Sequence, residues 1–332
     1  MKNKKADIIV FISISTVFFI FIFNRIGLGV DEYTYKSAYS YYLTQPNYFK
    51  FEYGFHFLYY ILKEIGISTD SFNNVVSLLF FLLTLLTVLI TVKKGYRSLV
   101  LLSLIFSGFY IDCIFNAYRQ GFAVMFVILS IHFYKENRLI KFIVSSLLAI
   151  GFHWSSILIL FFIFISNIIS DKILKKILLL LIFMHIFVIF IEVNIFEIFD
   201  YKVFINLNLK NISDAITSYI MKGGDSFYDY NLSWKLITIF PILFSLIFTY
   251  INYKYSLINC KIFIVTMTYS FIFIGMAYGF RNYYWALPIF SFLIPDLINN
   301  TKKWKVYSLL LYLPIWCFIG FFYSSILPMI YL

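Results

Sequence analysis

The stretch from Ser71 to Lys94 reads SFNNVVSLLFFLLTLLTVLITVKK. It carries no charged side chain before the Lys93-Lys94 pair that ends it. About 20 apolar residues cross a bilayer core of about 30 Å as a helix, at about 1.5 Å per residue. Inside lipid each backbone polar group needs a partner within its own segment. The stretch is therefore predicted to be a transmembrane helix with a basic end.

Similar apolar stretches recur along the whole chain. Hydrophobic residues make up 62% of the sequence and charged residues only 13%, which is about half the charge of a soluble domain. Spans are predicted near residues 6–24, 71–92, 98–112, 119–134, 139–152, 155–170, 173–191, 234–252, 258–277, 284–298 and 306–323. We expect an all-α polytopic membrane protein with about 11 transmembrane helices, forming a single integral membrane domain over residues 1–332.

The charged residues favour one orientation. With the N-terminus in the cytoplasm, the cytoplasmic segments hold 17 of the 27 Lys and Arg residues but only 4 of the 16 Asp and Glu residues. The positive-inside rule requires such basic cytoplasmic loops. The sorting explains the net charge of +11, so no nucleic-acid partner is expected. The three cysteines are scattered without a CxxC pair, and no metal site is predicted.

Two segments on the outer side are long, at residues 25–70 and 192–233. Within the first, residues 53–67 are apolar but too short and too charged to span, which indicates an interfacial or re-entrant helix. The second contains Gly223-Gly224 and is expected to fold over the outer face as a lid. Tyrosines cluster at the outer boundaries, where they form an interfacial belt or stack on sugars.

Three ionisable residues stand in very short outer connections, where charge is costly and indicates function. These residues are Arg119, His153 and Arg281. An arginine offers a planar fork of donors to phosphate oxygens, and Arg119 also opens a helix, where anions are favoured. The structural alternative for Arg119 is snorkelling or an ion pair with Asp112. His153 is either a general base, a donor to phosphate, or a histidine hydrogen-bonded between helices.

Other ionisable groups are less specific. His185 lies in the middle of a span and is expected to be structural. Asp31, Glu32 and Glu52 stand in a loop, where carboxylates are often simply solvated, but a helix follows Glu52 directly. The sequence has no zinc signature, no Gly-rich nucleotide loop and no serine elbow.

Five motifs together resemble a known family. They are Asp31 with Tyr35 and Tyr39, Phe51-Glu52-Tyr53-Gly54-Phe55, Asn116-Ala117-Tyr118-Arg119-Gln120-Gly121-Phe122-Ala123, Ala149-Ile150-Gly151-Phe152-His153-Trp154-Ser155-Ser156, and Phe280-Arg281-Asn282-Tyr283-Tyr284. Their order resembles the EpsG-type family of Wzy-like bacterial polysaccharide (O-antigen) polymerases. The Arg-Gln-x-x-Ala and Phe-His-x-Ser pieces are the specific part. The chain departs from the family pattern at Tyr53, where proline is frequent, and at Ser156, where alanine is frequent.

The resemblance implies a GT-C-like fold and a glycosyltransferase that needs no nucleotide cofactor. Such enzymes move a growing glycan from undecaprenyl diphosphate to a hydroxyl of a lipid-linked repeat unit, often beside a chain-length regulator. The implied diphosphate-binding residues are Arg119, Arg281 and Gln120. Glu52 or His153 is the implied base, and Asp31 orients the acceptor. The candidate sugar contacts are Tyr118, Trp154, Asn282 and Tyr283.

The expected location is the bacterial inner (plasma) membrane, with a multi-pass topology, a cytoplasmic N-terminus and the active site facing the periplasm or exterior. One alternative is a transporter or flippase of lipid-linked oligosaccharide, which would carry polar groups through the middle of the membrane. A second is an O-antigen ligase, which shares the chemistry but uses another acceptor. A third is a membrane acyltransferase that uses His153, although its thioester donor usually comes from the cytoplasmic side.

Overall fold

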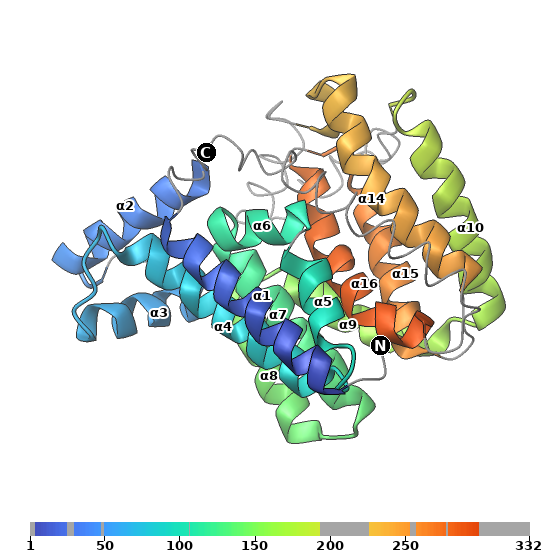
Figure 1. Ribbon diagram of the computed structural model, residues 1–332. Helices are drawn as coiled ribbons and strands as arrows, with labels where there is room; N and C mark the ends of the chain where they lie inside the picture. Colours follow the sequence, from blue (N-terminus) through green and yellow to red (C-terminus); the bar gives the residue numbers. More distant parts are fainter. Residues whose placement is uncertain are drawn as a thin grey trace. The chain divides into compact units, whose positions relative to one another are not determined.

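The computed structural model describes residues 4–24, 30–47, 50–105, 107–192, 226–252, 257–276 and 278–298. These residues form 13 α-helices and two short 3-10 helices (Figure 1). The chain divides into two compact units, here called unit 1 (Met1–Phe164 with Ser291–Leu332) and unit 2 (Ile165–Phe290). The prediction that the fold is all-α is confirmed for the described residues.

Unit 1 contains the helices from the N-terminal half of the chain. They are α1 (Lys4–Asn24), α2 (Val30–Thr44), α3 (Tyr53–Glu64), α4 (Phe72–Thr91), α5 (Arg97–Ile105), α6 (Gly108–Phe115), α7 (Tyr118–Lys135) and α8 (Leu139–Phe152). α9 (Ser156–Ile168) begins in unit 1 and ends in unit 2. α7 packs along α8 and α4, α1 packs on α4 and α5, and α3 packs on α8.

Unit 2 contains α10 (Asp171–Phe187), the 3-10 helix η1 (Phe227–Asp229), α14 (Leu232–Ile251), α15 (Ile258–Ile272) and the 3-10 helix η2 (Gly279–Asn282). α10 packs against α14 and α15, and Lys261 pairs with Asp171 at 2.8 Å. The last described helix, α16 (Tyr283–Ile298), starts in unit 2 and ends in unit 1.

Each predicted span within the described residues corresponds to helix, and one of them is broken. The predicted span 98–112 is divided into α5 and α6, which are bent by 72° relative to each other. By length and composition, three of the described helices can cross a membrane, namely α1, α4 and α14. The number rises to four if α5 and α6 together form one span. The chain is thus a membrane protein with several apolar helices, and the number of about 11 crossings remains a prediction.

The other described helices do not count as spans for two reasons. α8, α9 and α15 are apolar but shorter, whereas α7 and α10 have charged ends. α7 carries Arg119 in its first turn and Lys135 at its end, which shortens its apolar part. α10 begins with Asp171 and has lysines in its first two turns. The predicted span 306–323 and residues 193–225 of the predicted lid lie outside the described residues. The prediction of a single membrane domain likewise remains a prediction.

Helix α2 lies within the predicted outer segment 25–70, but the helix itself was not predicted. Its buried side chains include Tyr35, Tyr39 and Tyr42, spaced so that they share one face of a helix. Because these tyrosines alternate with polar residues, the segment lacks the apolar run used to find spans. Tyr39 Oη donates a hydrogen bond to the Ile67 carbonyl at 2.8 Å, which ties α2 to the turn after α3.

Helix α3 confirms the helix predicted within residues 53–67. Its 12 residues extend about 18 Å at about 1.5 Å per residue, less than the thickness of a bilayer core. It ends at Glu64, and Gly66 follows in the turn with a φ of +80° that favours glycine. Its buried face includes Phe55, Leu58 and Leu62, so α3 presents one apolar face to the rest of unit 1.

Candidate functional site

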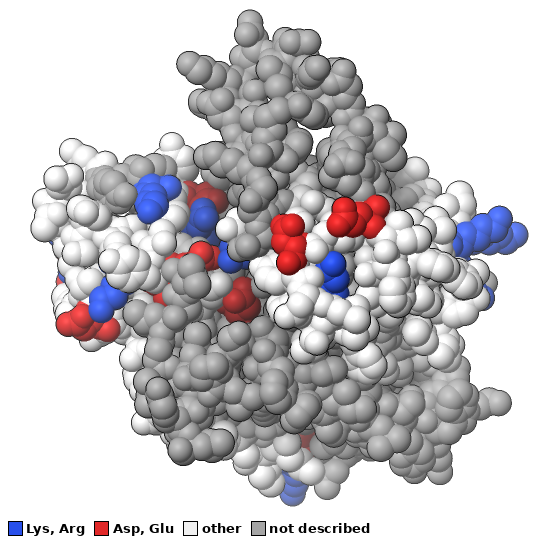
Figure 2. Space-filling model, turned by 90° about the horizontal axis from the view of Figure 1, so that it is seen from above, with Lys and Arg blue, Asp and Glu red and all other residues white. Residues whose placement is uncertain are grey.

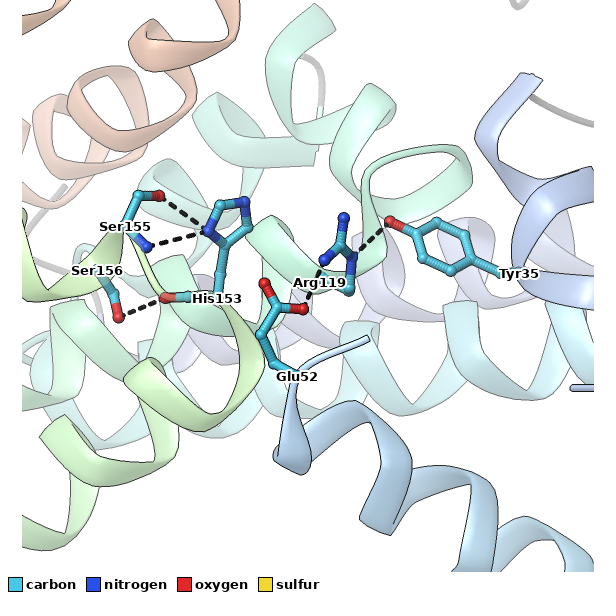
Figure 3. Close-up of polar contacts among 6 residues, drawn as sticks. All are labelled: Tyr35, Glu52, Arg119, His153, Ser155 and Ser156. Carbon is cyan, nitrogen blue, oxygen red and sulfur yellow. Dashed lines mark hydrogen bonds and ion pairs between the residues drawn. The ribbon is translucent and has the colours of Figure 1, made fainter. Parts of the chain in front are cut away.

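Arg119, at the start of α7, is the centre of a group of polar contacts in unit 1 (Figure 3). One terminal nitrogen, Nη1, lies 2.5 Å from Oε2 of Glu52. Its Nε donates a hydrogen bond to the Tyr35 hydroxyl at 3.2 Å. Asp112 instead accepts a hydrogen bond from the Asn116 amide at 3.0 Å. The ion pair of Arg119 is therefore with Glu52, rather than with Asp112.

Two aromatic rings hold the Arg119 guanidinium from its faces. Its Cζ lies 4.7 Å from the centre of the Phe51 ring and 5.9 Å from that of Tyr35. Such cation–π contacts are worth about 0.5–2 kcal/mol. The Arg119 side chain is 28% exposed while that of Glu52 is 9% exposed. The guanidinium is thus oriented by its neighbours and remains accessible to a ligand.

The residues around Arg119 are held by α2. The buried hydroxyl of Tyr118 donates a hydrogen bond to the carboxylate of Glu32, which is itself fully buried. The Asp31 N–H donates to the side-chain oxygen of Asn116 at 2.7 Å. Since these contacts reach residues 116 to 118, α2 fixes the backbone just before Arg119.

His153 directly follows the last residue of α8. The Ser155 backbone N–H donates to Nδ1 of His153 at 3.3 Å, and Ser155 Oγ lies 2.8 Å from the same nitrogen. Because an N–H can only donate, Nδ1 is an acceptor here, and the neutral ring carries its proton on Nε2. The Ser156 hydroxyl donates to the His153 carbonyl at 2.7 Å, which fixes the turn into α9.

A backbone contact between two glycines brings the segments that carry Glu52 and His153 close together. A β-carbon on Gly54 would lie 2.7 Å from the carbonyl carbon and oxygen of Gly151, so the backbones of α3 and α8 are in direct contact. Glu52 stands two residues before Gly54, and His153 stands two residues after Gly151. Figure 3 shows the Glu52 carboxylate between the His153 imidazole and the Arg119 guanidinium. We refer to Tyr35, Phe51, Glu52, Arg119 and His153 as the Arg119 site.

Arg281 belongs to unit 2, within η2. Its Cζ lies 5.0 Å from the centre of the Tyr278 ring. The neighbouring Asn282 carbonyl shares the Ser270 hydroxyl proton with the Thr266 carbonyl, and each carbonyl oxygen lies 2.9 Å from Ser270 Oγ. Tyr283 is buried, and its hydroxyl lies 2.7 Å from Nε2 of His185. His185 therefore makes the contact between helices expected of a structural histidine.

A model of the EpsG family matches residues 7–331, which is nearly the whole chain. The chain belongs to the EpsG family. This family is linked to exopolysaccharide synthesis, so the family resemblance drawn from the five motifs is confirmed at this level. Comparison with curated proteins and with solved structures gives no match.

The remaining candidate residues of this EpsG-family protein differ in exposure. Gln120 is 7% exposed, and Tyr118 is fully buried. Trp154 is 56% exposed beside His153, so its ring is available to a ligand. Asp31 is partly buried at the start of α2.

The face of the molecule seen in Figure 2 shows few charged side chains among its described residues. Seen from above in Figure 2, the Lys and Arg side chains lie singly or beside acidic ones, amid uncharged surface. Within the described ranges, no group of three or more His, Cys, Asp or Glu residues could hold a metal ion. The Arg119 site offers a cation, a carboxylate and an imidazole, from Arg119, Glu52 and His153.

Some residues of the Arg119 site were not identified from the sequence as functional. Tyr35 and Phe51 were part of the family motifs, but their contacts with the guanidinium join residues far apart in the chain. Ser155 stands two residues after His153, a spacing at which a serine side chain can form a hydrogen bond with the imidazole. Gly54 and Gly151 were also in the motifs, and a glycine inside a helix signals a close backbone approach.

Proposed function

We propose that this EpsG-family protein is a polysaccharide polymerase at the outer face of the bacterial inner membrane. It transfers a growing glycan from undecaprenyl diphosphate to a hydroxyl of a lipid-linked repeat unit. The observation that supports this most is the accessible Arg119 guanidinium beside Glu52 and His153. A cation next to a carboxylate and an imidazole suits a reaction with an anionic leaving group and a hydroxyl nucleophile.

The proposed reaction is a glycosyl transfer at the donor sugar. The acceptor oxygen forms a bond to the anomeric carbon, and the bond from that carbon to the diphosphate oxygen breaks. Undecaprenyl diphosphate leaves with the bonding electron pair, and the acceptor proton passes to a base. The transition state resembles an oxocarbenium ion. Because the donor carries its own activated bond, no nucleotide enters the reaction.

Arg119 is proposed to bind the leaving diphosphate. A guanidinium stays charged at all working pH values and binds phosphate oxygens through two parallel N–H donors. The Phe51 and Tyr35 rings and the Tyr35 hydroxyl already orient it, so little reorganisation is needed when charge develops on the leaving group. Arg281 and Gln120 are proposed as further diphosphate contacts.

Glu52 is proposed as the base, because the hydrogen bonds of His153 favour a different role for the histidine. With Nδ1 occupied by the Ser155 N–H, the neutral imidazole offers an N–H at Nε2 and no lone pair for a proton. His153 is thus suited to donate to a diphosphate or sugar oxygen. Glu52, beside it, has an anionic oxygen that accepts a proton from a hydroxyl.

The ion pair of Glu52 with Arg119 links the two proposed roles. In the structure the carboxylate is held by the guanidinium at 2.5 Å. A diphosphate that competes for Arg119 draws positive charge away from Glu52, and the carboxylate then becomes a better base. Activation of the acceptor would in this way follow binding of the donor. Asp31 is proposed to orient the acceptor. Trp154 and Asn282 are proposed to contact sugars directly, while the buried Tyr118 and Tyr283 act through their neighbours.

The rival functions differ in their products. A flippase would leave lipid-linked repeat units trapped in the inner leaflet when it fails, and an O-antigen ligase would use a different acceptor. In a strain lacking the gene, the wild-type chain should restore long-chain polysaccharide ladders. Arg119→Ala should leave single repeat units on the outer leaflet, whereas full ladders from Arg119→Ala at normal expression would contradict the proposed role of this residue.

Arg138→Ala is a matched control for this complementation. Arg138 is also an arginine that pairs with a glutamate, Glu136, at 3.0 Å, but it follows α7 at the end opposite Arg119. The proposed function predicts wild-type ladders from the control, because Arg138 is not among the proposed diphosphate contacts.

A further inference from the structure

His185 in α10 is fully buried, and both of its ring nitrogens make hydrogen bonds of 2.7 Å. The Leu181 carbonyl can only accept, so Nδ1 carries the ring proton and donates it. Nε2 must then accept from the Tyr283 hydroxyl. The ring also packs on Phe271, with 4.9 Å between ring centres. This contact therefore has one defined direction, from Tyr283 to His185.

The segment that carries Arg281 is fixed on both sides. Before Arg281, a β-carbon on Gly279 would lie 1.9 Å from the Phe273 carbonyl oxygen, so no other residue fits there. Tyr278 has a φ of +55°, a conformation that persists only where the surroundings impose it. After Arg281, the Asn282 carbonyl and the Tyr283 hydroxyl are bonded to Ser270 and His185.

We propose that His185 is a positioning residue for Arg281, acting through Tyr283 and together with Ser270, and that the ligand it serves is a lipid diphosphate. The proposal rests on the proposed function in one respect, namely that Arg281 binds a diphosphate. An ionisable side chain inside an apolar helix is costly and indicates function. The hydrogen-bond partner that offsets this cost is Tyr283, the first residue of α16, which stands two residues after Arg281.

The contact can affect binding because a guanidinium needs a defined orientation to use two donors at once. Tyr283 and Asn282 directly follow Arg281, so a rotation of either residue moves the arginine backbone. Without the His185 and Ser270 bonds, the Arg281 side chain would sample positions from which only one donor reaches the ligand. The loss should therefore appear in ligand affinity rather than only in protein stability.

The experiment measures the Kd of farnesyl diphosphate for the full-length protein in lipid nanodiscs, with farnesol as the control for tail binding. His185→Leu and Tyr283→Phe should each raise Kd about tenfold, and Ser270→Ala about threefold. His185→Gln keeps an acceptor for Tyr283 and should restore most of the affinity. Thr266→Val, on the same helix as Ser270, removes a hydroxyl bonded only to the Ile262 carbonyl of its own helix and should leave Kd unchanged.

An Arg281→Ala background separates positioning from a general structural role. In that background, His185→Leu should raise Kd no further, because the arginine that it positions is absent. A further increase in Kd would overturn the positioning role of His185. An unchanged Kd for Tyr283→Phe and Ser270→Ala variants of normal thermal stability would overturn it as well. Neither result would contradict the diphosphate role of Arg281. Equal binding by wild type and Arg281→Ala would instead refute the diphosphate role of Arg281, and the positioning proposal with it. If Tyr283→Phe does not fold, Ser270→Ala decides.

Discussion

The backbones of Gly54 and Gly151 are in contact, but the contact is asymmetric. A β-carbon on Gly54 would lie 2.7 Å from the backbone of Gly151, whereas one on Gly151 would lie 3.7 Å from the backbone of Gly54. The first distance is a clash with atoms that cannot turn away, and the second is ordinary van der Waals contact. This close approach sets the separation between the start of α3 and the end of α8.

Gly54→Ala should therefore impair the Arg119 site much more than Gly151→Ala. The alanine at 54 pushes α3 from α8 and moves Glu52 relative to His153. Because a displacement of about 1 Å costs about 100-fold in rate, we expect a loss of about 10- to 100-fold in polymer formation. Gly151→Ala adds the same methyl group, but its rate of polymer formation should stay within about threefold of the wild-type rate. Equal losses from both variants would show that the glycines are needed for some other reason.

Replacement of Arg119 should show that charge alone is insufficient. Arg119→Ala should reduce the rate of polymer formation by about 100- to 1,000-fold, the usual effect of removing one donor to a developing anion. Arg119→Lys keeps the charge but loses the fork of donors and the stacking on Phe51, so it should recover less than about a tenth of the lost rate. Single-turnover rates with purified protein measure both variants. Recovery of full rate by lysine would favour a simple electrostatic role.

Glu52→Gln tests the assignment of the base. Glutamine keeps the size of the side chain and a carbonyl oxygen for the Arg119 N–H, but it cannot take a proton at neutral pH. We expect kcat to fall about 100- to 10,000-fold while KM for the lipid-linked unit changes little. A variant that raised KM and preserved kcat would instead indicate that Glu52 only positions Arg119.

Ser155→Ala should have a small effect, in contrast to His153→Ala. The alanine variant loses the hydroxyl contact with Nδ1, but the backbone N–H at residue 155 still donates to this nitrogen. The proton therefore stays on Nε2, and we expect a loss within about fivefold, against about 100-fold or more for His153→Ala. Initial rates of the two variants provide the comparison. A large loss from Ser155→Ala would mean that the hydroxyl itself takes part in the reaction.

Asp7 is expected to matter for stability rather than for catalysis. Its buried carboxylate accepts hydrogen bonds from the Gly95 N–H at 2.8 Å, the Ser98 N–H at 3.0 Å and the Ser98 hydroxyl at 2.7 Å. Asp7→Ala leaves these donors without their partner, which costs about 1–3 kcal/mol for each unsatisfied group. The melting temperature in detergent should fall, while the rate of the remaining folded protein should be unchanged.

The positions of most helices could be predicted from the sequence, because a long apolar run in lipid has only one regular structure open to it. The number of about 11 crossings stays a prediction, since α7 and α10 combine apolar residues with charged ends. Helix α2 was missed for a related reason. Its buried face consists of tyrosines, whose spacing at 35, 39 and 42 was the only available signal.

The Arg119 site could be predicted in its parts but not in its contacts. Arg119, Glu52 and His153 were each identified from their motifs and from their position at the ends of apolar stretches. Their pairing depends on the packing of α3 against α8 and of α8 against α7, which joins residues 67 positions apart in the case of Glu52 and Arg119. From the sequence alone, the nearby Asp112 was the carboxylate expected to pair with the arginine, and its pairing with Glu52 was not predicted.

The most direct test of the proposed function is a polymerisation assay with purified protein and the lipid-linked repeat unit as the only substrate. The proposal predicts that the wild-type chain and Arg138→Ala form a ladder of longer glycans and release undecaprenyl diphosphate, one for each bond formed, while Arg119→Ala forms none. A ladder of wild-type length and rate from Arg119→Ala, or no ladder from the active wild-type preparation, would contradict it.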